Sequence, residues 1–207
     1  MFHLPITSLK SQFGDIDIYL FDQLLKGHIQ KGMKLLDAGC GNGRNVYYLM
    51  QAGVKVYGAD VSEAAIQRMQ QLAKELAPTL PKRNFIVADL EHLPFQNDVF
   101  DVVICSAVLH FARSEDHFKT IVEQLWRVLK PGGMLFCRFS TTIGLEGKLQ
   151  QVEGKFYHMA HGPVWFLADA EMLNQLEKQL GAERADPLKT TIVEQDRSMT
   201  TWVLRKE

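Results

Sequence analysis

The sequence of 207 residues contains only three cysteines, Cys40, Cys105 and Cys137, each inside an apolar, strand-like stretch. Such a sparse, odd set does not make the disulfide framework of a small secreted protein. The chain also lacks a basic amino-terminal region followed by a long apolar run. Its longest nearly apolar stretch, Val99 to Leu109, is too short to span a bilayer. We therefore expect a cytoplasmic protein with no membrane-spanning segment.

An excess of charge of either sign is also missing. Lys and Arg together number 23 against 24 for Asp and Glu, so the formal net charge is −1. Proteins that hold nucleic acid through its phosphates carry excess or clustered positive charge, so we expect no nucleic-acid partner. The residues present are 46% hydrophobic and 23% charged, which is the balance of an ordinary globular protein with a substantial core.

Short apolar runs alternate with amphipathic segments through the middle of the chain. Five runs predict strands that are apolar on both faces, as buried parallel strands are: Lys34–Asp37, Val54–Ala59, Asn84–Ala88, Val99–Ser106 and Met134–Phe139. Ser62 and Ser114 stand where the N-caps of intervening helices are expected. Strands and helices that alternate in this way assemble through right-handed crossovers into a parallel sheet with helices on both faces.

The flanking segments complete a single α/β domain. Residues 15–29 have the period of an amphipathic helix, and a second helix is expected to begin at Asp169 and end at Gly181. Residues 187–204 predict a β-hairpin that adds one antiparallel strand to a doubly wound, mostly parallel, Rossmann-like sheet. The expected parts are a helical cap (1–31), a ligand-binding core (32–139), a polar, glycine-interrupted insert (140–166) and a C-terminal helix and hairpin (167–207).

The most informative stretch is Leu35–Asn45, LLDAGCGNGRN. A strand leads into Gly39, Gly41 and Gly43, and a helix follows at once, so a ligand can touch the backbone at the helix N-terminus. A dinucleotide site requires the spacing G-x-G-x-x-G, whereas this loop reads G-x-G-x-G with Asp37 two residues before it. A carboxylate there would repel a pyrophosphate and suit a ligand with an amine, which disfavours an NAD-type oxidoreductase.

This loop resembles the first motif of the class I S-adenosylmethionine-dependent methyltransferases, D-x-G-x-G-x-G after hydrophobic residues. Further motifs follow in the family's order: Asp60 ends the second strand, Asp89 ends the third, and LKPGGMLF at 129–136 matches the turn and fifth strand. The resemblance covers about residues 35–139. It implies the methyltransferase sheet and transfer of a methyl group from S-adenosylmethionine. The loop and the Tyr-rich helix after it are most similar to the small-molecule branch that includes tellurite-resistance and thiopurine-type enzymes.

The resemblance also implies a cofactor site. Asp60 is the expected acceptor for the ribose hydroxyls, and Asp89 is the expected partner of the adenine amino group, with Leu90 packed on the ring. Arg44 and the helix N-terminus are the expected partners of the methionyl carboxylate. The other residues expected to line the cofactor are Asp37, Ala38, Gly39, Cys40, Gly41, Gly43, Asn45, Val61 and Ser106.

The acceptor side of the site carries fewer signals. His110 follows the fourth strand and is the candidate catalytic base, because an imidazole titrates near neutral pH; a structural or cofactor-lining histidine is the alternative. Tyr157, His158, His161 and Trp165 of the insert are candidate substrate residues, and the aromatic ones suit an apolar or aromatic acceptor. The two insert histidines are spaced H-x-x-H, but no third ligand stands at a helpful local spacing, so we expect no metal.

The sequence lacks two signatures of DNA methyltransferases. After the fourth strand, Cys105–Val108 stands where the amino-directed enzymes carry Asn or Asp before Pro-Pro-Tyr or Pro-Pro-Phe, and the Pro-Cys nucleophile of the cytosine C5 enzymes is missing. We therefore expect a small-molecule methyl acceptor. The alternatives are a non-catalytic partner subunit that keeps the cofactor site and a methyltransferase that acts on protein or RNA. The sequence determines neither the acceptor nor the oligomeric state.

Overall fold

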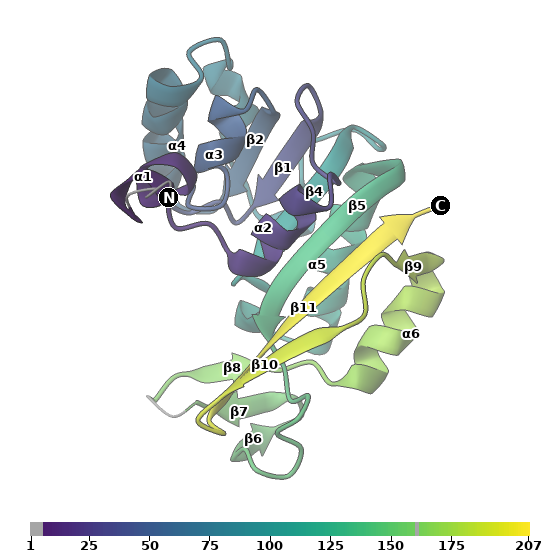
Figure 1. The fold of residues 1–207 in the computed structure, drawn as a ribbon. Coiled ribbons are helices and arrows are strands. Elements are labelled where there is room, and N and C mark those ends of the chain that lie inside the picture. The colour runs from purple at the N-terminus through teal and green to yellow at the C-terminus, as the bar shows by residue number, and fades with distance from the viewer. Residues whose placement is uncertain (1–5, 160–161) are drawn as a thin grey trace.

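One sheet runs through the middle of the fold. The computed structural model describes residues 6–159 and 162–207. The strands of this sheet are β1 (Lys34–Ala38), β2 (Lys55–Asp60), β3 (Phe85–Val87), β4 (Phe100–Ser106), β5 (Leu129–Ser140), β9 (Ala182–Arg184), β10 (Lys189–Val193) and β11 (Arg197–Lys206). Their order is β10-β11-β5-β4-β1-β2-β3, with β9 paired to β11 beside that path (Figure 1).

The strand directions confirm the predicted fold class. Strands β1 to β5 pair in parallel. β11 is antiparallel to β5, and β9 and β10 are antiparallel to β11, so both of these run in the same direction as β5. β11 is therefore the one strand that opposes the others in the described sheet. As a consequence, the carboxyl ends of β1 to β5 share one edge, which is where open α/β sheets bind ligands.

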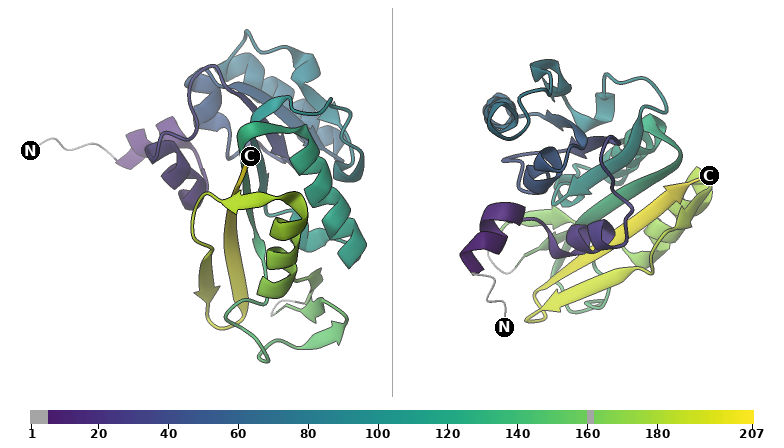
Figure 2. Two further views of the ribbon diagram at one scale, coloured as in Figure 1. Left: turned by 90° about the vertical axis from the view of Figure 1, so that its right-hand side faces the viewer. Right: turned by 45° about the horizontal axis from the view of Figure 1, so that its top comes forward.

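Helices cover both faces of the sheet (Figure 2). They are α1 (Ile6–Phe13), α2 (Ile18–Leu25), α3 (Tyr47–Gln51), α4 (Glu63–Leu76), α5 (Glu115–Val128) and α6 (Ala170–Leu180), with single 3-10 turns η1 (Lys82–Asn84), η2 (Leu90–His92) and η3 (Leu109–Phe111). Buried side chains of α5 and α6 join one hydrophobic cluster, and those of α2, α3 and α4 join another. Successive strand residues alternate between the two, as Leu36 and Leu35 do. No helix in the described residues is long and apolar enough to cross a membrane.

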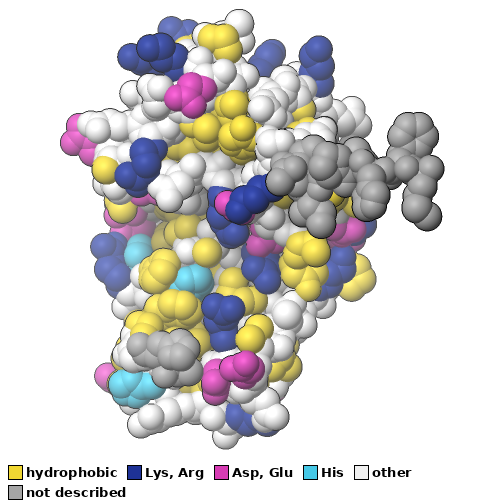
Figure 3. All heavy atoms as spheres, turned by 60° about the vertical axis from the view of Figure 1, so that its left-hand side comes forward, with side chains coloured by type: hydrophobic (Ala, Val, Ile, Leu, Met, Phe, Trp, Pro, Cys, Tyr) yellow, Lys and Arg dark blue, Asp and Glu magenta, His cyan; other side chains and the backbone are white. Residues whose placement is uncertain are grey.

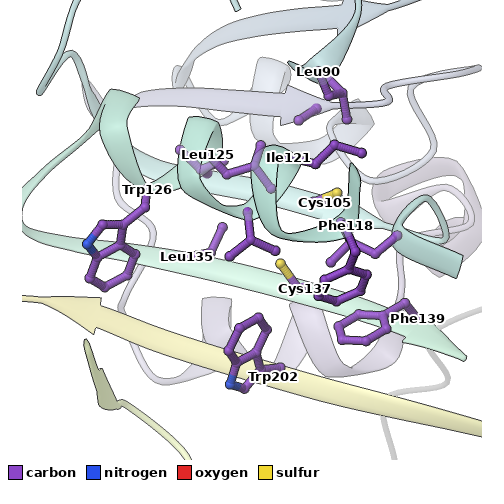
Figure 4. Packing of buried hydrophobic residues seen from close by; sticks show 14 of the residues in the cluster. Leu90, Cys105, Phe118, Ile121, Leu125, Trp126, Leu135, Cys137, Phe139 and Trp202 are labelled. Atoms are coloured by element: carbon purple, nitrogen blue, oxygen red, sulfur yellow. The ribbon is translucent and has the colours of Figure 1, made fainter. Parts of the chain in front are cut away.

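The cluster under α5 and α6 is aromatic where these helices meet β5 and β11 (Figure 4). The ring of Phe139 has its centroid 5.6 Å from that of Phe118 and 6.3 Å from that of Trp202. The Trp202 side chain is fully buried, and its Nε1 donates to Oε1 of Glu177 at 2.7 Å. The indole is thus buried without an unsatisfied donor, and it holds the hairpin strand β11 against α6.

The helix ends follow their sequence signals. Ser62, Ser114 and Asp169 each accept, through a side-chain oxygen, the backbone N–H of the third residue that follows. Gly181 ends α6 in the left-handed conformation, with φ of 61°. The predicted starts of these three helices and the predicted end of α6 are confirmed.

Three segments differ from the expectation. The helix expected to begin at Arg44, directly after the glycine loop, begins only at Tyr47 as α3, because residues 44–46 form turns. The helix expected over residues 15–29 begins only at Ile18, because the Asp17 carboxylate accepts the Tyr19 N–H and caps it there, and it ends at Leu25. α1 precedes it as a separate helix. The insert, whose short runs carry no readable period, forms its own antiparallel sheet of β6 (Gln151–Glu153), β7 (Phe156–His158) and β8 (Val164–Phe166).

We predict that Gly43→Ala destabilises the fold more than Gly132→Ala. Both glycines are left-handed, with φ of 74° and 76°, so both alanines suffer similar backbone strain of roughly 1–2 kcal/mol. A Cβ at position 43 would lie 2.5 Å from Sδ of Met69 and 2.8 Å from Cδ2 of Leu72, whereas a Cβ at position 132 meets no atom within 4 Å. Overpacking adds roughly 1–3 kcal/mol to the first variant alone. Urea unfolding without ligand measures the difference, and equal losses would contradict it.

Candidate active site

Two cavities lie at the carboxyl edge of the sheet and adjoin at Gly39, which lines both. The first, of about 650 Å³, lies over the loop after β1 and reaches the N-terminal segment; the second, of about 410 Å³, lies beyond the ends of β2 and β3. The structure gathers here every residue predicted to line the cofactor except Ala38. Those in the first cavity are Asp37, Gly39, Cys40, Gly41, Gly43, Arg44, Asn45 and Ser106, and those in the second are Gly39, Asp60, Val61, Asp89 and Leu90.

Two glycines of the loop after β1 have opposite surroundings: Gly39 packs closely against a side chain, and Gly41 faces open space. At Gly39, with φ of 75°, a Cβ would lie 2.4 Å from Cγ2 of Val108, so the side chain after β4 excludes any larger residue. At Gly41, with φ of 49°, a Cβ would meet no atom within 4 Å. The backbone at Gly41 therefore faces the cavity, where a ligand can approach it.

Asp37 is the acid of the first cavity. Its side chain is buried, and no other described residue donates a hydrogen bond to its carboxylate. The pKa of Asp37 is raised to about 7, chiefly by burial; the nearby Arg44 guanidinium lowers it and the Asp60 carboxylate raises it. A buried carboxylate to which no described residue donates a hydrogen bond is a receptor for a cationic group, because a bound cation would remove this cost.

Asp60 holds the loop and the second cavity together. Its Oδ2 accepts the Gly41 N–H and its Oδ1 accepts the Ser62 N–H, both at 2.9 Å. Each oxygen keeps a further lone pair, so the carboxylate can also accept hydroxyl groups. The carboxylate is thus fixed at the junction between the turn after β1 and the start of α4.

The rest of the second cavity offers a polar rim and an apolar floor. Asp89 is exposed, and its Oδ1 accepts the Glu91 N–H at 3.0 Å, which caps η2. Leu90 is only 6% exposed and lies in the floor, while Val61 is 69% exposed at the rim. A flat ring on Leu90 would therefore have the Asp89 carboxylate beside it.

Two of the residues predicted to line the cofactor, Ala38 and Cys40, are buried and contribute packing rather than polar contacts. Ala38 is fully buried within β1 and lines neither cavity. Cys40 lines the first cavity but is buried, and burial raises the pKa of its thiol, with Asp37 and Asp60 adding to the effect. The thiol therefore stays protonated and is a poor nucleophile, in agreement with its expected role as a small neighbour.

The N-terminal segment is joined to residues of the first cavity by Asp17, a residue that the sequence did not reveal. Asp17 is nearly fully buried, and its backbone N–H donates to Oδ1 of Asn45 at 3.0 Å. Its Oδ2 accepts from Nη1 of Arg138 at 3.0 Å and lies 3.8 Å from Nη2 of Arg44. Nη2 of Arg44 also lies 3.4 Å from Oγ of Ser106. The one available signal was the amphipathic period of residues 15–29, which marked the segment but not this contact.

His110 is packed rather than exposed. Its side chain is 3% exposed, and its Nδ1 accepts the Ser140 N–H at 3.3 Å. The neutral ring therefore carries its proton on Nε2, which donates and does not accept. Burial, with a smaller contribution from the Arg197 charge, lowers the pKa of His110 to about 4. This arrangement favours a positioning residue over a general base.

The insert brings one of its candidate residues to the site. Trp165 stacks on His110, with ring centroids 4.4 Å apart and an interplanar angle of 28°. Tyr157 pairs with Trp165 across the small sheet, so the two side chains share one of its faces. His158 is exposed. His161 lies outside the described residues.

Comparison with known proteins identifies the family. A family model described as a methyltransferase domain matches residues 36–137. An uncharacterised protein of Methanocaldococcus jannaschii is 31% identical over 180 residues, which span 84% of this chain and 76% of that protein. The chain belongs to the class I S-adenosylmethionine-dependent methyltransferases.

The other relatives place limits on what the family implies. A tRNA U34 carboxymethyltransferase of Idiomarina loihiensis is 29% identical over 177 residues, which cover 83% of this chain and 52% of that enzyme. This methyltransferase chain thus spans about half the length of that relative. A solved structure of a Pyrococcus horikoshii protein has a TM-score of 0.70 at 22% identity and covers 92% of this chain and 89% of its own, which shows the shared fold.

The family's cofactor is S-adenosylmethionine, and the residues present fit it. The first cavity offers an unpartnered carboxylate, Asp37, for its ammonium and open backbone at Gly41. The second offers acceptors and an apolar floor for a nucleoside. Because the two cavities adjoin at Gly39, one ligand can place its amino-acid end in the first cavity and its nucleoside end in the second.

We predict that His110 makes the methyltransferase less stable as the pH falls from about 6.5 to about 4. The pKa of His110 is lowered from 6.5 to about 4 on folding, so between these values the unfolded chain binds more protons and stability rises with pH. The full effect is on the order of 3 kcal/mol.

The measurement is urea unfolding across this range for the wild type and His110→Asn, which keeps an acceptor for the Ser140 N–H. Carboxylates also titrate in this range, so the readout is the difference between the two proteins. Parallel pH profiles would contradict the prediction.

Proposed function

We propose that this protein transfers the methyl group of S-adenosylmethionine to a small-molecule acceptor. The observation that carries the proposal is the pair of adjoining cavities, one with the buried acid Asp37 and the other with Asp60 and Asp89 at its polar rim. An amino-acid end and a nucleoside end would each meet groups of suitable chemistry. The cofactor residues are the predicted ones, with Ala38 acting through packing alone.

Each end of the cofactor has assigned partners in this proposal. Asp37 pairs with the ammonium group, and Arg44 with the carboxylate, because oppositely charged groups in a partly buried site hold each other and fix orientation. Asp60 accepts from the ribose hydroxyls through the lone pairs that its backbone donors leave free. Asp89 accepts from the adenine amino group while Leu90 packs against the ring.

Alignment supplies most of the catalysis in this proposal. The bound cofactor supplies a methyl group on a positively charged sulfur; a lone pair of the acceptor forms the new bond to carbon, and the electrons of the broken carbon–sulfur bond stay on sulfur. The chain's part is to hold the acceptor in line and keep water out. His110 supports the acceptor side through its ring contacts with Phe111 and Trp165, and a proton lost by the acceptor leaves to solvent.

The acceptor is proposed as a small molecule because the described surface around the site is not strongly basic. The side of the molecule in Figure 3 shows basic and acidic side chains interspersed with hydrophobic ones. RNA is the second candidate, because the names of some relatives say that they act on tRNA, at 29% and 34% identity. Those names describe the relatives, two of which have about half or more of their length outside the match.

We predict that cofactor binding releases about half a proton at pH 7. The pKa of Asp37 is about 7 without a ligand, so about half of the molecules carry a proton there, and an ammonium partner would expel it by lowering that pKa. Titration calorimetry with S-adenosylhomocysteine, in two buffers of different ionisation enthalpy, measures the release. It should vanish in Asp37→Asn and decline towards pH 9, and equal enthalpies in both buffers at pH 7 would rule out the pairing.

We predict methyl transfer to the low-molecular-weight fraction of a cell extract and none to tRNA. Purified protein is incubated with S-adenosylmethionine labelled in the methyl group, and label is followed into each fraction, with Asp60→Ala as the inactive control. Label in tRNA alone would overturn the small-molecule acceptor. Cofactor binding without label in either fraction would favour the non-catalytic alternative, and no cofactor binding would overturn the proposed function itself.

A further inference from the structure

Three aromatic rings form a continuous wall beside the cofactor cavities. His110 and Phe111 come from the turn after β4, and Trp165 comes from β8 of the insert. The ring centroid of His110 is 4.4 Å from that of Phe111 and 4.4 Å from that of Trp165, and the last two are 5.7 Å apart. Phe111 is 59% exposed and lines the second cavity. The wall therefore begins at the cofactor site and continues to the insert.

A separate cavity of about 290 Å³ lies at the far end of this wall. Trp165 lines it together with Met159 and Pro163 of the insert and Val193 at the end of β10. This volume is at the lower limit of small-molecule pockets. A single ring or two fused rings would therefore fill it. In Figure 3, hydrophobic side chains gather next to histidines on this side of the molecule.

Trp165 is not the only aromatic residue that joins the insert to the core among the described residues. Its neighbour Phe166 is 1% exposed and packs on Phe118 of α5 and Phe156 of β7, with ring centroids 5.4 and 5.6 Å away. Phe166 therefore attaches the small sheet to the core. Trp165 is only half-buried, which leaves part of the indole available to a ligand.

The charged side chains among the described residues of this cavity are mixed in sign. The turn after β10 contributes Glu194 and Asp196, and the first residue of β11 contributes Arg197; all three are exposed, so water and salt weaken their fields. The adjacent His110 ring is uncharged at neutral pH, since its pKa is about 4. The wall thus selects for shape and apolar surface.

We propose that this cavity binds the methyl acceptor, and that the acceptor is a flat, uncharged aromatic ring system stacked against Trp165. The inference rests on the proposed function, because it names the acceptor class of the same site. Stacking on the indole strengthens binding by roughly two- to tenfold beyond the burial of apolar area, and a saturated ring of the same skeleton cannot obtain this gain.

The test compares 2-naphthol with decahydro-2-naphthol, which has the same skeleton without aromaticity. Each is titrated calorimetrically into full-length protein saturated with S-adenosylhomocysteine. Trp126 and Trp202 are buried at 7% and 0% exposure, so quenching of tryptophan fluorescence reports mainly on Trp165. We expect 2-naphthol to bind roughly two- to tenfold more tightly than the saturated alcohol and to quench the fluorescence.

Two variants locate the binding. Trp165→Ala removes the stacking surface, and Val193→Trp fills the cavity from a residue that is 40% exposed, so this second variant is expected to fold even if the first does not. Both variants should weaken the binding of 2-naphthol roughly tenfold, while the affinity for S-adenosylhomocysteine should change by less than twofold. Trp165→Phe, which keeps a ring, should retain most of the affinity.

Several results would overturn this inference. They are equal binding of the two alcohols, 2-naphthol binding that neither variant weakens, preference for phenyltrimethylammonium, and methyl transfer to tRNA alone. In each of these cases S-adenosylhomocysteine still binds, so the cofactor site stands and only the acceptor class fails. If the wild type does not bind S-adenosylhomocysteine, the proposed function fails first.

Discussion

The carboxylate of Asp60 accepts two backbone N–H groups, from Gly41 in the loop after β1 and from Ser62 at the start of α4. This pair of hydrogen bonds fixes the loop against the neighbouring strand and so determines where the two cavities meet. Hydrogen bonds to an ionised acceptor are stronger than neutral ones. The N-terminal segment adds a further contact just after this loop, because the Asp17 N–H donates a hydrogen bond to Asn45.

The site combines two acids: Asp60, whose carboxylate accepts backbone hydrogen bonds, and Asp37, whose carboxylate accepts none from the described residues. Asp60 is satisfied by backbone donors, whereas Asp37 is buried without a donor among the described residues and has a raised pKa. Such an arrangement costs stability until a cation arrives. A site that keeps a buried carboxylate in spite of its free-energy cost is prepared for a cationic ligand. This is the usual reason why carboxyl groups with shifted pKa values lie at sites of binding and catalysis.

The acceptor side is built differently from the cofactor side. The proposed cofactor residues lie at the carboxyl ends of strands of the central sheet and on the loops directly after them, whereas the aromatic wall joins the turn after β4 to a separate small sheet. Packing of Phe166 onto the core brings the insert back over the sheet edge. The same scaffold can therefore keep its cofactor chemistry while the insert alters the acceptor pocket.

The sequence by itself determined the parallel core, the helix caps and the cofactor loop, because each depends on local signals: apolar runs, capping oxygens, and glycines at fixed spacing after a strand. It also marked Trp165 as an aromatic residue of the insert. Only the tertiary structure decided that Asp17 pairs with Arg138 across 121 residues, that His110 is packed with its Nδ1 already satisfied, and that Trp165 stacks on it. These contacts join segments distant in the chain, and no local pattern records which distant side chains meet when the sheet closes.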